Sequence, residues 1–246
     1  MSGIDADAWL FDLGNTRLKW TRLTGGEDPV AFAHGARADA VAQADLPRGD
    51  VAHVACVAAP PLRDALLQAL AQRFARIHVA RTLPRSGGVR IAYEVPERLG
   101  VDRFLSLLAA HRRGGDTLVV SVGTALTLDL VDAAGRHHGG RIAPSPALMR
   151  EALHGRAAHL PESGGAYAEF AADTADALAS GCDGAALALV ERTRAQACDR
   201  LGHAPALLLY GGGAAPLASR LPDAVLVPNL VLEGLAQWAR LGAGAG

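Results

Sequence analysis

"WLFDLGNTRLKW", residues 9 to 20, predicts two strands joined by a short turn of small polar residues. Apolar side chains alternate with others over residues 8 to 13, a period of two that is typical of a strand. Asp12 lies at the end of this strand, and Gly14, Asn15 and Thr16 follow it before the second strand begins. A plain hairpin needs no carboxylate beside its turn, so the stretch raises a question of function.

The composition limits the classes of protein to which the chain can belong. It has 246 residues, 50% of them hydrophobic, enough for one large core or two smaller ones. The net charge is −1 and aromatic residues make up 4%, so we expect no nucleic-acid partner. The apolar runs are too short to span a bilayer, and no basic region precedes the first of them as in a secretory signal. We therefore expect a cytoplasmic protein with no membrane partner.

The order of predicted elements indicates an α/β fold made of two similar halves. The first half is predicted to contain strands at 8–13, 17–23, 29–34 and 51–58 and an amphipathic helix that ends at about Phe74. The second half is predicted to contain strands at 116–123, 125–133, 136–144 and 206–212 and helices at 174–201, 213–221 and 229–241. The repeated order predicts a duplicated domain, with boundaries at 1–113 and 114–246.

Each half opens with a strand that ends in a turn of small residues, DLGNT at 12–16 and SVGTA at 121–125. The backbone N–H groups of such a turn can bind phosphate oxygens, and glycine allows a close approach. Asp12 is suited to hold Mg²⁺, and Lys19 could lie near a terminal phosphate. The alternatives are a structural turn with a solvated aspartate and a surface lysine. We expect a nucleotide phosphate to lie in a cleft between facing turns.

A third group of polar residues precedes an apolar helix in AYEVPERLGVDRFLSLLAAH, residues 92–111. Arg103 could bind a substrate carboxylate with two parallel hydrogen bonds. Asp102, beside it, could accept the proton of a substrate hydroxyl as that hydroxyl attacks phosphorus. The alternative is that Asp102 only caps the helix, where the helix dipole favours a carboxylate.

Taken together, DLGNTRLKW, GVDR, VGTALTLD and GGRIAP resemble, in this order and spacing, the type III pantothenate kinase family. The resemblance extends from Phe11 to about Gly234. It implies two duplicated ribonuclease H-like domains with a central cleft, as in the actin-like ATPase superfamily that includes the acetate and sugar kinases. It also implies that ATP phosphorylates pantothenate to 4′-phosphopantothenate, the first step of coenzyme A synthesis, with Mg²⁺ as cofactor.

The resemblance assigns roles to residues that match the family motifs. It implies that Asp102 is the general base, that Tyr93 lines the pantothenate pocket, and that Thr174 contacts pantothenate, often across a homodimer interface. The pantothenate motif comprises Gly100, Val101, Asp102 and Arg103. The implied ATP contacts are Asp12, Leu13, Gly14, Asn15, Thr16, Arg17, Leu18, Lys19 and Thr124.

One departure from the family concerns a monovalent cation. The family usually has an aspartate that binds K⁺ or NH₄⁺ where this chain has Ser121. Serine is a neutral and weaker ligand, so we expect weaker cation binding. Asp129 is expected to serve a loop or a magnesium-bound water rather than to replace the missing carboxylate.

Several other residues have ordinary structural interpretations. His137 and His138 have no partner at metal-binding spacing, so we expect solvated loop histidines. The three cysteines are expected to be buried apolar thiols. Helix positions Leu178, Cys182, Ala185, Ala186 and Leu189 suit either the core or a dimer interface.

Two other functions stay open at this stage. One is a non-catalytic regulator of the same fold, because a lost cation ligand could mark a lapsed enzyme. The presence of Asp12, Asp102 and Arg103 counts against it. The other is a phosphoanhydride hydrolase of the superfamily, which would need a carboxylate that positions water and no arginine that binds an acid.

Overall fold

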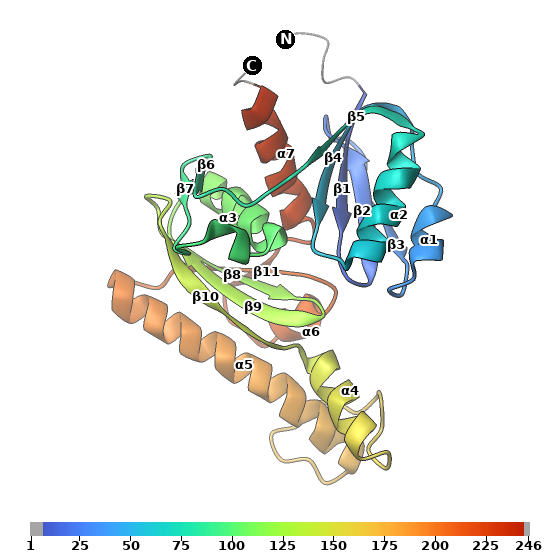
Figure 1. The fold of residues 1–246 in the computed structure, drawn as a ribbon. Coiled ribbons are helices and arrows are strands. Elements are labelled where there is room, and N and C mark those ends of the chain that lie inside the picture. The colour runs from blue at the N-terminus through green and yellow to red at the C-terminus, as the bar shows by residue number, and fades with distance from the viewer. Residues whose placement is uncertain (1–6, 244–246) are drawn as a thin grey trace. The chain divides into compact units, whose positions relative to one another are not determined.

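A computed structural model describes residues 7–243, which form two compact units (Figure 1). The first unit runs to Arg112 and resumes at Asn229, and the second is Arg113–Pro228. Each unit contains one five-stranded sheet with helices packed against it. No helix within residues 7–243 is both long enough and apolar enough to cross a bilayer.

The sheet of the first unit has the strand order β3-β2-β1-β4-β5. β1 pairs antiparallel with β2 and parallel with β4, and β4 pairs parallel with β5. Phe11 and Phe74 pack edge to face in the core, with 5.6 Å between their ring centroids. The strands are Ala8–Leu13, Arg17–Arg22, Val30–Ala33, Gly49–Cys56 and Phe74–Val79 for β1 to β5.

The remaining elements of the first unit include α3, which begins within the GVDR sequence at residues 100–103. They are α1 (Ala38–Ala42), α2 (Pro60–Ala71), β6 (Arg85–Ser86), β7 (Val89–Arg90), η1 (Pro96–Arg98), α3 (Val101–Arg113) and α7 (Leu230–Ala243). The prediction that α2 extends to about Phe74 was wrong. α2 ends at Ala71, and Phe74 begins β5, a strand that the sequence analysis did not predict.

The sheet of the second unit repeats the order of the first as β10-β9-β8-β11-β12. Again two antiparallel pairs are followed by two parallel pairs, so the predicted duplication is confirmed. The strands β8 to β12 are Thr117–Val122, Ala125–Val131, His137–Pro144, Ala206–Tyr210 and Ala224–Leu226. The helices α4 to α6 are Pro146–Arg156, Thr174–Leu201 and Ala214–Ala218.

The units differ from the predicted domains at the C-terminal end. The predicted second domain includes the last helix, but α7 contacts β1 and β4 and belongs to the first unit. Apolar side chains including Leu230 and Leu235 are buried along α7. Gly234 lets α7 approach α3, because a Cβ at this position would overlap the backbone carbonyl of Leu105.

Candidate active site

The turn between β1 and β2 has the form expected of a phosphate-binding loop. Leu13 pairs with Leu18, and the N–H of Gly14 donates to the carbonyl of Arg17 over 2.9 Å. Asn15 and Thr16 between them are exposed. A Cβ on Gly14 would meet only the Arg17 oxygen at 3.5 Å, an ordinary contact. No contact within the described chain therefore requires glycine here, and the space that a Cβ would fill is available to a ligand.

Asp12 lies at the end of β1 in an environment that disfavours its charge. Burial raises the pKa of Asp12 to about 7, the negative charge of Asp102 contributes to this rise, and the positive charge of Lys19 opposes it. Lys19 is directly opposite Asp12 on β2, and its Nζ donates to Oδ1 of Asn229 over 3.5 Å. The fold thus brings Asp12, Asp102 and Lys19 into one electrostatic group within the first unit.

Asp102 lies within the first turn of α3 rather than at the residue before it, because α3 begins at Val101. Its Oδ1 accepts a 2.8 Å hydrogen bond from the N–H of Arg103. A Cβ on Gly100 would lie 2.6 Å from this same oxygen. Glycine at position 100 therefore provides the room that the Asp102 carboxylate occupies.

Arg103 is buried, with 4% of the residue exposed. Its Nη1 donates to the hydroxyl of Tyr93 over 3.3 Å, and its Cζ lies 5.9 Å from the Tyr93 ring centroid. Burial and the contact with Tyr93 both limit the movement of the guanidinium. A planar, permanently charged group held in this way is suited to bind a carboxylate.

Two buried hydroxyls that the sequence analysis missed fix the backbone on either side of this motif. Thr82 Oγ1 donates to the carbonyl of Leu99, and Ser106 Oγ donates to that of Arg103, each over 2.8 Å. Both side chains are small polar groups in apolar surroundings, where an internal partner is required. The sequence around Thr82 and Ser106 gave no signal for these hydrogen bonds. The accepting residue lies 17 positions from Thr82 and 3 positions from Ser106.

The turn between β8 and β9 occupies the corresponding place in the second unit. The N–H of Gly123 donates to the carbonyl of Ala125 over 3.0 Å, and Thr124 is exposed. Ser121 on β8 is partly buried and lies between Thr127 of β9 and Tyr210 of β11.

The glycines at 211–213 pack directly against this second turn. A Cβ on Gly213 would lie 2.9 Å from Cγ1 of Val122, and the N–H of Gly213 donates to the Val122 carbonyl over 2.9 Å. Gly211 has a φ of +102°, which favours glycine.

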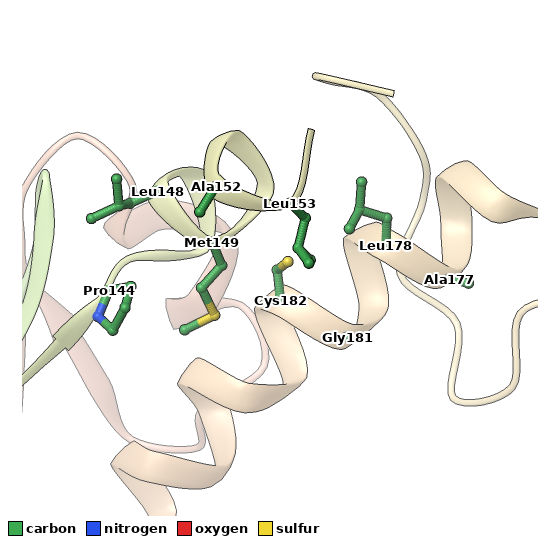
Figure 2. A pocket seen from close by; sticks show the side chains of 9 residues that line it. All are labelled: Pro144, Leu148, Met149, Ala152, Leu153, Ala177, Leu178, Gly181 and Cys182. Atoms are coloured by element: carbon green, nitrogen blue, oxygen red, sulfur yellow. The ribbon is translucent and has the colours of Figure 1, made fainter. Parts of the chain in front are cut away.

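Thr174 begins α5 in the second unit and is exposed. Asp173 caps this helix by accepting from the N–H of Ala175 over 2.8 Å. Nearby, an apolar groove of about 690 Å³ lies between α4 and α5. Figure 2 shows Met149 and Leu153 of α4 facing Cys182 of α5 across it.

The structure corrects three interpretations of polar side chains. His137 is buried rather than solvated, and its Nε2 lies 3.0 Å from Oδ1 of Asp129, which is also buried and lies on β9 rather than in a loop. The His138 side chain, 12% exposed, lies with its Nε2 2.8 Å from Oδ2 of Asp132. Of the cysteines, only Cys182 is buried, whereas Cys56 and Cys198 are partly exposed.

The residues around Asp12 fit a magnesium ion that arrives with a nucleotide. Within the part of the chain that the structure describes, no three His, Cys, Asp or Glu side chains are grouped to hold a metal by themselves. Asp12 offers one hard oxygen ligand beside a turn open to phosphates, and Mg²⁺ is usually bound by one or two carboxylates together with substrate phosphates. A divalent cation would also offset the lost solvation and the repulsion from Asp102, which together raise the pKa of Asp12.

Comparison with known proteins shows the family. The sequence profile of type III pantothenate kinase matches residues 9–196. The chain belongs to the type III pantothenate kinase family. A type III pantothenate kinase of Stenotrophomonas maltophilia (strain K279a) is 58% identical over 234 residues, which cover 94% of this chain and 96% of that one. One from Xanthomonas campestris pv. campestris (strain B100) is 57% identical over the same shares.

Solved structures show the same fold at low sequence identity, in agreement with the predicted fold. A Campylobacter jejuni protein described as a Baf family transcriptional activator is 19% identical, with a TM-score of 0.67 over 96% of this chain and 99% of that one. A protein described as a 2-dehydro-3-deoxygalactonokinase from Sinorhizobium meliloti is 16% identical, with a TM-score of 0.58 over 95% of this chain and 98% of that one. An archaeal actin homologue in complex with ADP is 11% identical, with a TM-score of 0.51 over 97% of this chain and 99% of that one.

Proposed function

We propose that this protein transfers the γ-phosphoryl group of ATP to pantothenate and produces 4′-phosphopantothenate and ADP in the cytoplasm. One observation supports this proposal more than any other: a general-base candidate, Asp102, lies next to a buried arginine and close enough to Asp12 to perturb its pKa. The substrate has a carboxylate and a primary hydroxyl, and this arrangement provides one group for each.

In the proposed mechanism Arg103 binds the pantothenate carboxylate, and Tyr93 holds the guanidinium in place. Asp102 accepts the hydroxyl proton while the hydroxyl oxygen forms a bond to the γ-phosphorus. The bond from phosphorus to the β,γ-bridging oxygen breaks, and the electron pair leaves with ADP. The Gly100 and Val101 backbone completes the pantothenate motif by placing Asp102 and Arg103 at the start of α3.

The turn between β1 and β2 is the proposed binding site for the ATP phosphates. The exposed N–H groups of Asn15 and Thr16, with the Lys19 ammonium, are suited to bind anionic oxygens. Leu13 and Leu18 are fully buried and contribute by fixing the strands, while Arg17 is exposed beside the turn. The family resemblance adds Thr124 as a further ATP contact.

Asp12 would hold Mg²⁺ directly or through water. When bound, the ion neutralises charge that develops on the phosphates. A monovalent cation is the less supported cofactor, because Ser121 supplies no negative charge at the family position.

We infer a homodimer that is formed through α5. A Cβ on Gly181 would meet nothing within 4 Å, so no contact within the described residues requires glycine in the middle of this helix. Phe170, beside the helix, is 99% exposed, which favours a surface covered by a second copy. Thr174 is the proposed pantothenate contact at the start of the same helix.

Light scattering tests the dimer. The wild type should have twice the mass of the monomer, and Gly181→Glu should shift it toward the monomer because the new charge would be buried at the interface. A wild-type monomer would overturn this inference without affecting the proposed reaction.

The reaction is tested by incubating purified protein with ATP, Mg²⁺ and pantothenate and measuring the product mass. We expect ADP and a product heavier than pantothenate by one phosphoryl group. ADP and free phosphate formed equally with and without pantothenate would instead support a hydrolase. No turnover of ATP under any condition would support a non-catalytic role.

A further inference from the structure

His34 is a buried histidine in the first unit that the proposed mechanism does not use. Only 2% of the residue is exposed, and it follows β3 immediately. Its Nε2 lies 3.1 Å from the carbonyl oxygen of Gly14, and the N–H of Ala36 donates to its Nδ1 over 3.2 Å. Because a carbonyl oxygen only accepts, and Nδ1 accepts from Ala36, this pair of hydrogen bonds requires the ring to carry a proton on Nε2.

The backbone around His34 also binds the turn. The N–H groups of His34 and Gly35 both donate to the carbonyl of Thr16, over 3.1 and 3.3 Å. This double contact occurs where the chain bends sharply, with φ values of +56° at Gly35 and +61° at Ala36. The left-handed conformation is unfavourable for alanine, which indicates that the contacts around the bend hold it in place.

The orientation of the Gly14 peptide determines which way the next amide points. In a planar trans peptide the C=O and the following N–H point in opposite directions. A hydrogen bond from His34 that holds the Gly14 oxygen toward the protein interior therefore directs the Asn15 N–H away from it. Among the described residues the amides of Asn15 and Thr16 donate to no backbone carbonyl in the turn, and both residues are exposed.

We propose that His34 is a positioning residue for ATP binding: its ring holds the carbonyl of Gly14 inward and its backbone holds that of Thr16, so that the turn presents the Asn15 N–H to the phosphates. Without this anchor the Gly14 peptide can rotate and present a carbonyl oxygen, which repels phosphate. This inference rests on the proposed role of the β1–β2 turn in nucleotide binding.

Two amide variants separate the two ring contacts. In His34→Gln the side-chain nitrogen can occupy the place of Nε2 and donate to Gly14. In His34→Asn the shorter side chain can accept from Ala36 at the place of Nδ1 but cannot reach Gly14. Val41→Ala is the control for destabilisation, because Val41 is buried in the adjacent α1 and is not part of the turn.

The measurements are calorimetric binding of a non-hydrolysable ATP analogue with Mg²⁺, the KM values for ATP and pantothenate, and the melting temperature. We expect His34→Asn to weaken analogue binding about ten-fold, the usual size of one lost hydrogen bond with an exposed donor misplaced, and to raise the KM for ATP similarly. The KM for pantothenate should stay within about two-fold of wild type. His34→Gln should bind the analogue within about two-fold of wild type, and so should Val41→Ala.

Equal analogue affinity in His34→Asn and wild type would overturn the inference. The inference would also fail if Val41→Ala and His34→Asn had the same melting temperature and lost the same analogue affinity. A wild type that binds the analogue but leaves pantothenate unchanged would overturn the proposed reaction and still allow the His34 comparison. A wild type that does not bind the analogue would overturn both.

Discussion

Asp12 and Asp102 come from distant parts of the chain, yet burial and the negative charge of Asp102 together raise the pKa of Asp12 to about 7. One carboxylate ends a strand and the other lies in the first turn of a helix. Their repulsion disfavours having both ionised without a cation nearby. The proposed site is therefore arranged for a state in which Mg²⁺ and phosphates are bound.

Replacing Asp12 should change the dependence of stability on pH. The folded-state pKa of about 7 lies above the ordinary value of 3.8, so between these values the folded state binds more protons and rising pH destabilises it. Asp12→Asn should therefore raise the melting temperature more at pH 8 than at pH 5. The rise in the pKa of Asp12 corresponds to at most about 4 kcal/mol of folding free energy. The effect should be smaller than this limit, because Asp12 is partly exposed and solvent screens its charge. Thermal denaturation of both proteins without Mg²⁺ measures the difference in melting temperature. Equal stabilisation by Asp12→Asn at pH 5 and pH 8 would contradict the prediction.

Asp102→Asn keeps the shape of the side chain but cannot accept the hydroxyl proton. The variant should fold normally and lose roughly 10²–10⁴-fold in kcat, the usual contribution of a general base. Steady-state kinetics and circular dichroism measure the two properties. Turnover close to that of the wild type would mean that Asp102 acts only through the helix dipole.

Gly100→Ala tests the position of the same carboxylate. The new Cβ would lie 2.6 Å from Asp102 Oδ1, so the carboxylate must move. Because misplacement of a catalytic group by about 1 Å can reduce the rate on the order of 10²-fold, we expect a clear loss of kcat. Gly155→Ala in α4 is the matched control, because nothing lies within 4 Å of its Cβ. Similar kcat values for the two variants would show that the space beside Asp102 is unimportant.

Arg103→Lys tests the proposed carboxylate contact. Lysine keeps the charge but loses the planar pair of donors, so the KM for pantothenate should rise far more than the KM for ATP. Tyr93→Phe removes only the hydroxyl that accepts from Arg103 and should give a smaller change of the same kind. If Arg103→Lys impairs the use of both substrates equally, Arg103 does not act specifically on pantothenate.

Ser121→Asp tests the monovalent cation. The wild type should depend weakly on K⁺, and restoring a carboxylate should increase this dependence because a full negative charge is added. Turnover is measured against KCl at constant ionic strength, with a bulky organic cation as the balancing salt. A steep K⁺ requirement in the wild type would show that other oxygens complete the site.

The regular elements could be predicted from the sequence where local signals mark their ends. Helix 174–201 matches α5 because Asp173 caps its start and Gly202, with a φ of +80°, ends it. Comparable signals mark the start of α4, which was not predicted: Ser145 accepts from the N–H of Leu148, and Pro146 is the first helical residue. β5 was missed because its first residue, Phe74, continues the apolar pattern of α2.

The polar groups that depend on distant partners could not be predicted in the same way. His137 is buried and meets Asp129 on β9 beside a register irregularity between His137 and Gly140 in β10. Gly139, with a φ of +94°, and Gly140 mark that irregularity in the sequence, but they do not identify the distant partner of His137. His34 was likewise not recognised, since its partners lie across a turn. Asp12, Asp102 and Arg103 could be proposed as site residues because their residue types and motif context carry chemical meaning, and these roles stay predictions.

The membership of α7 in the first unit has a consequence for how the protein is made. Synthesis proceeds from the N-terminus, and the second unit is one continuous segment, so the ribosome releases all of its residues before α7 emerges. The first unit must wait for its final helix to cover the apolar face of β1 and β4. The half of the molecule that is begun first is therefore completed last, and its unfinished sheet is the part of the nascent chain that most needs protection from aggregation.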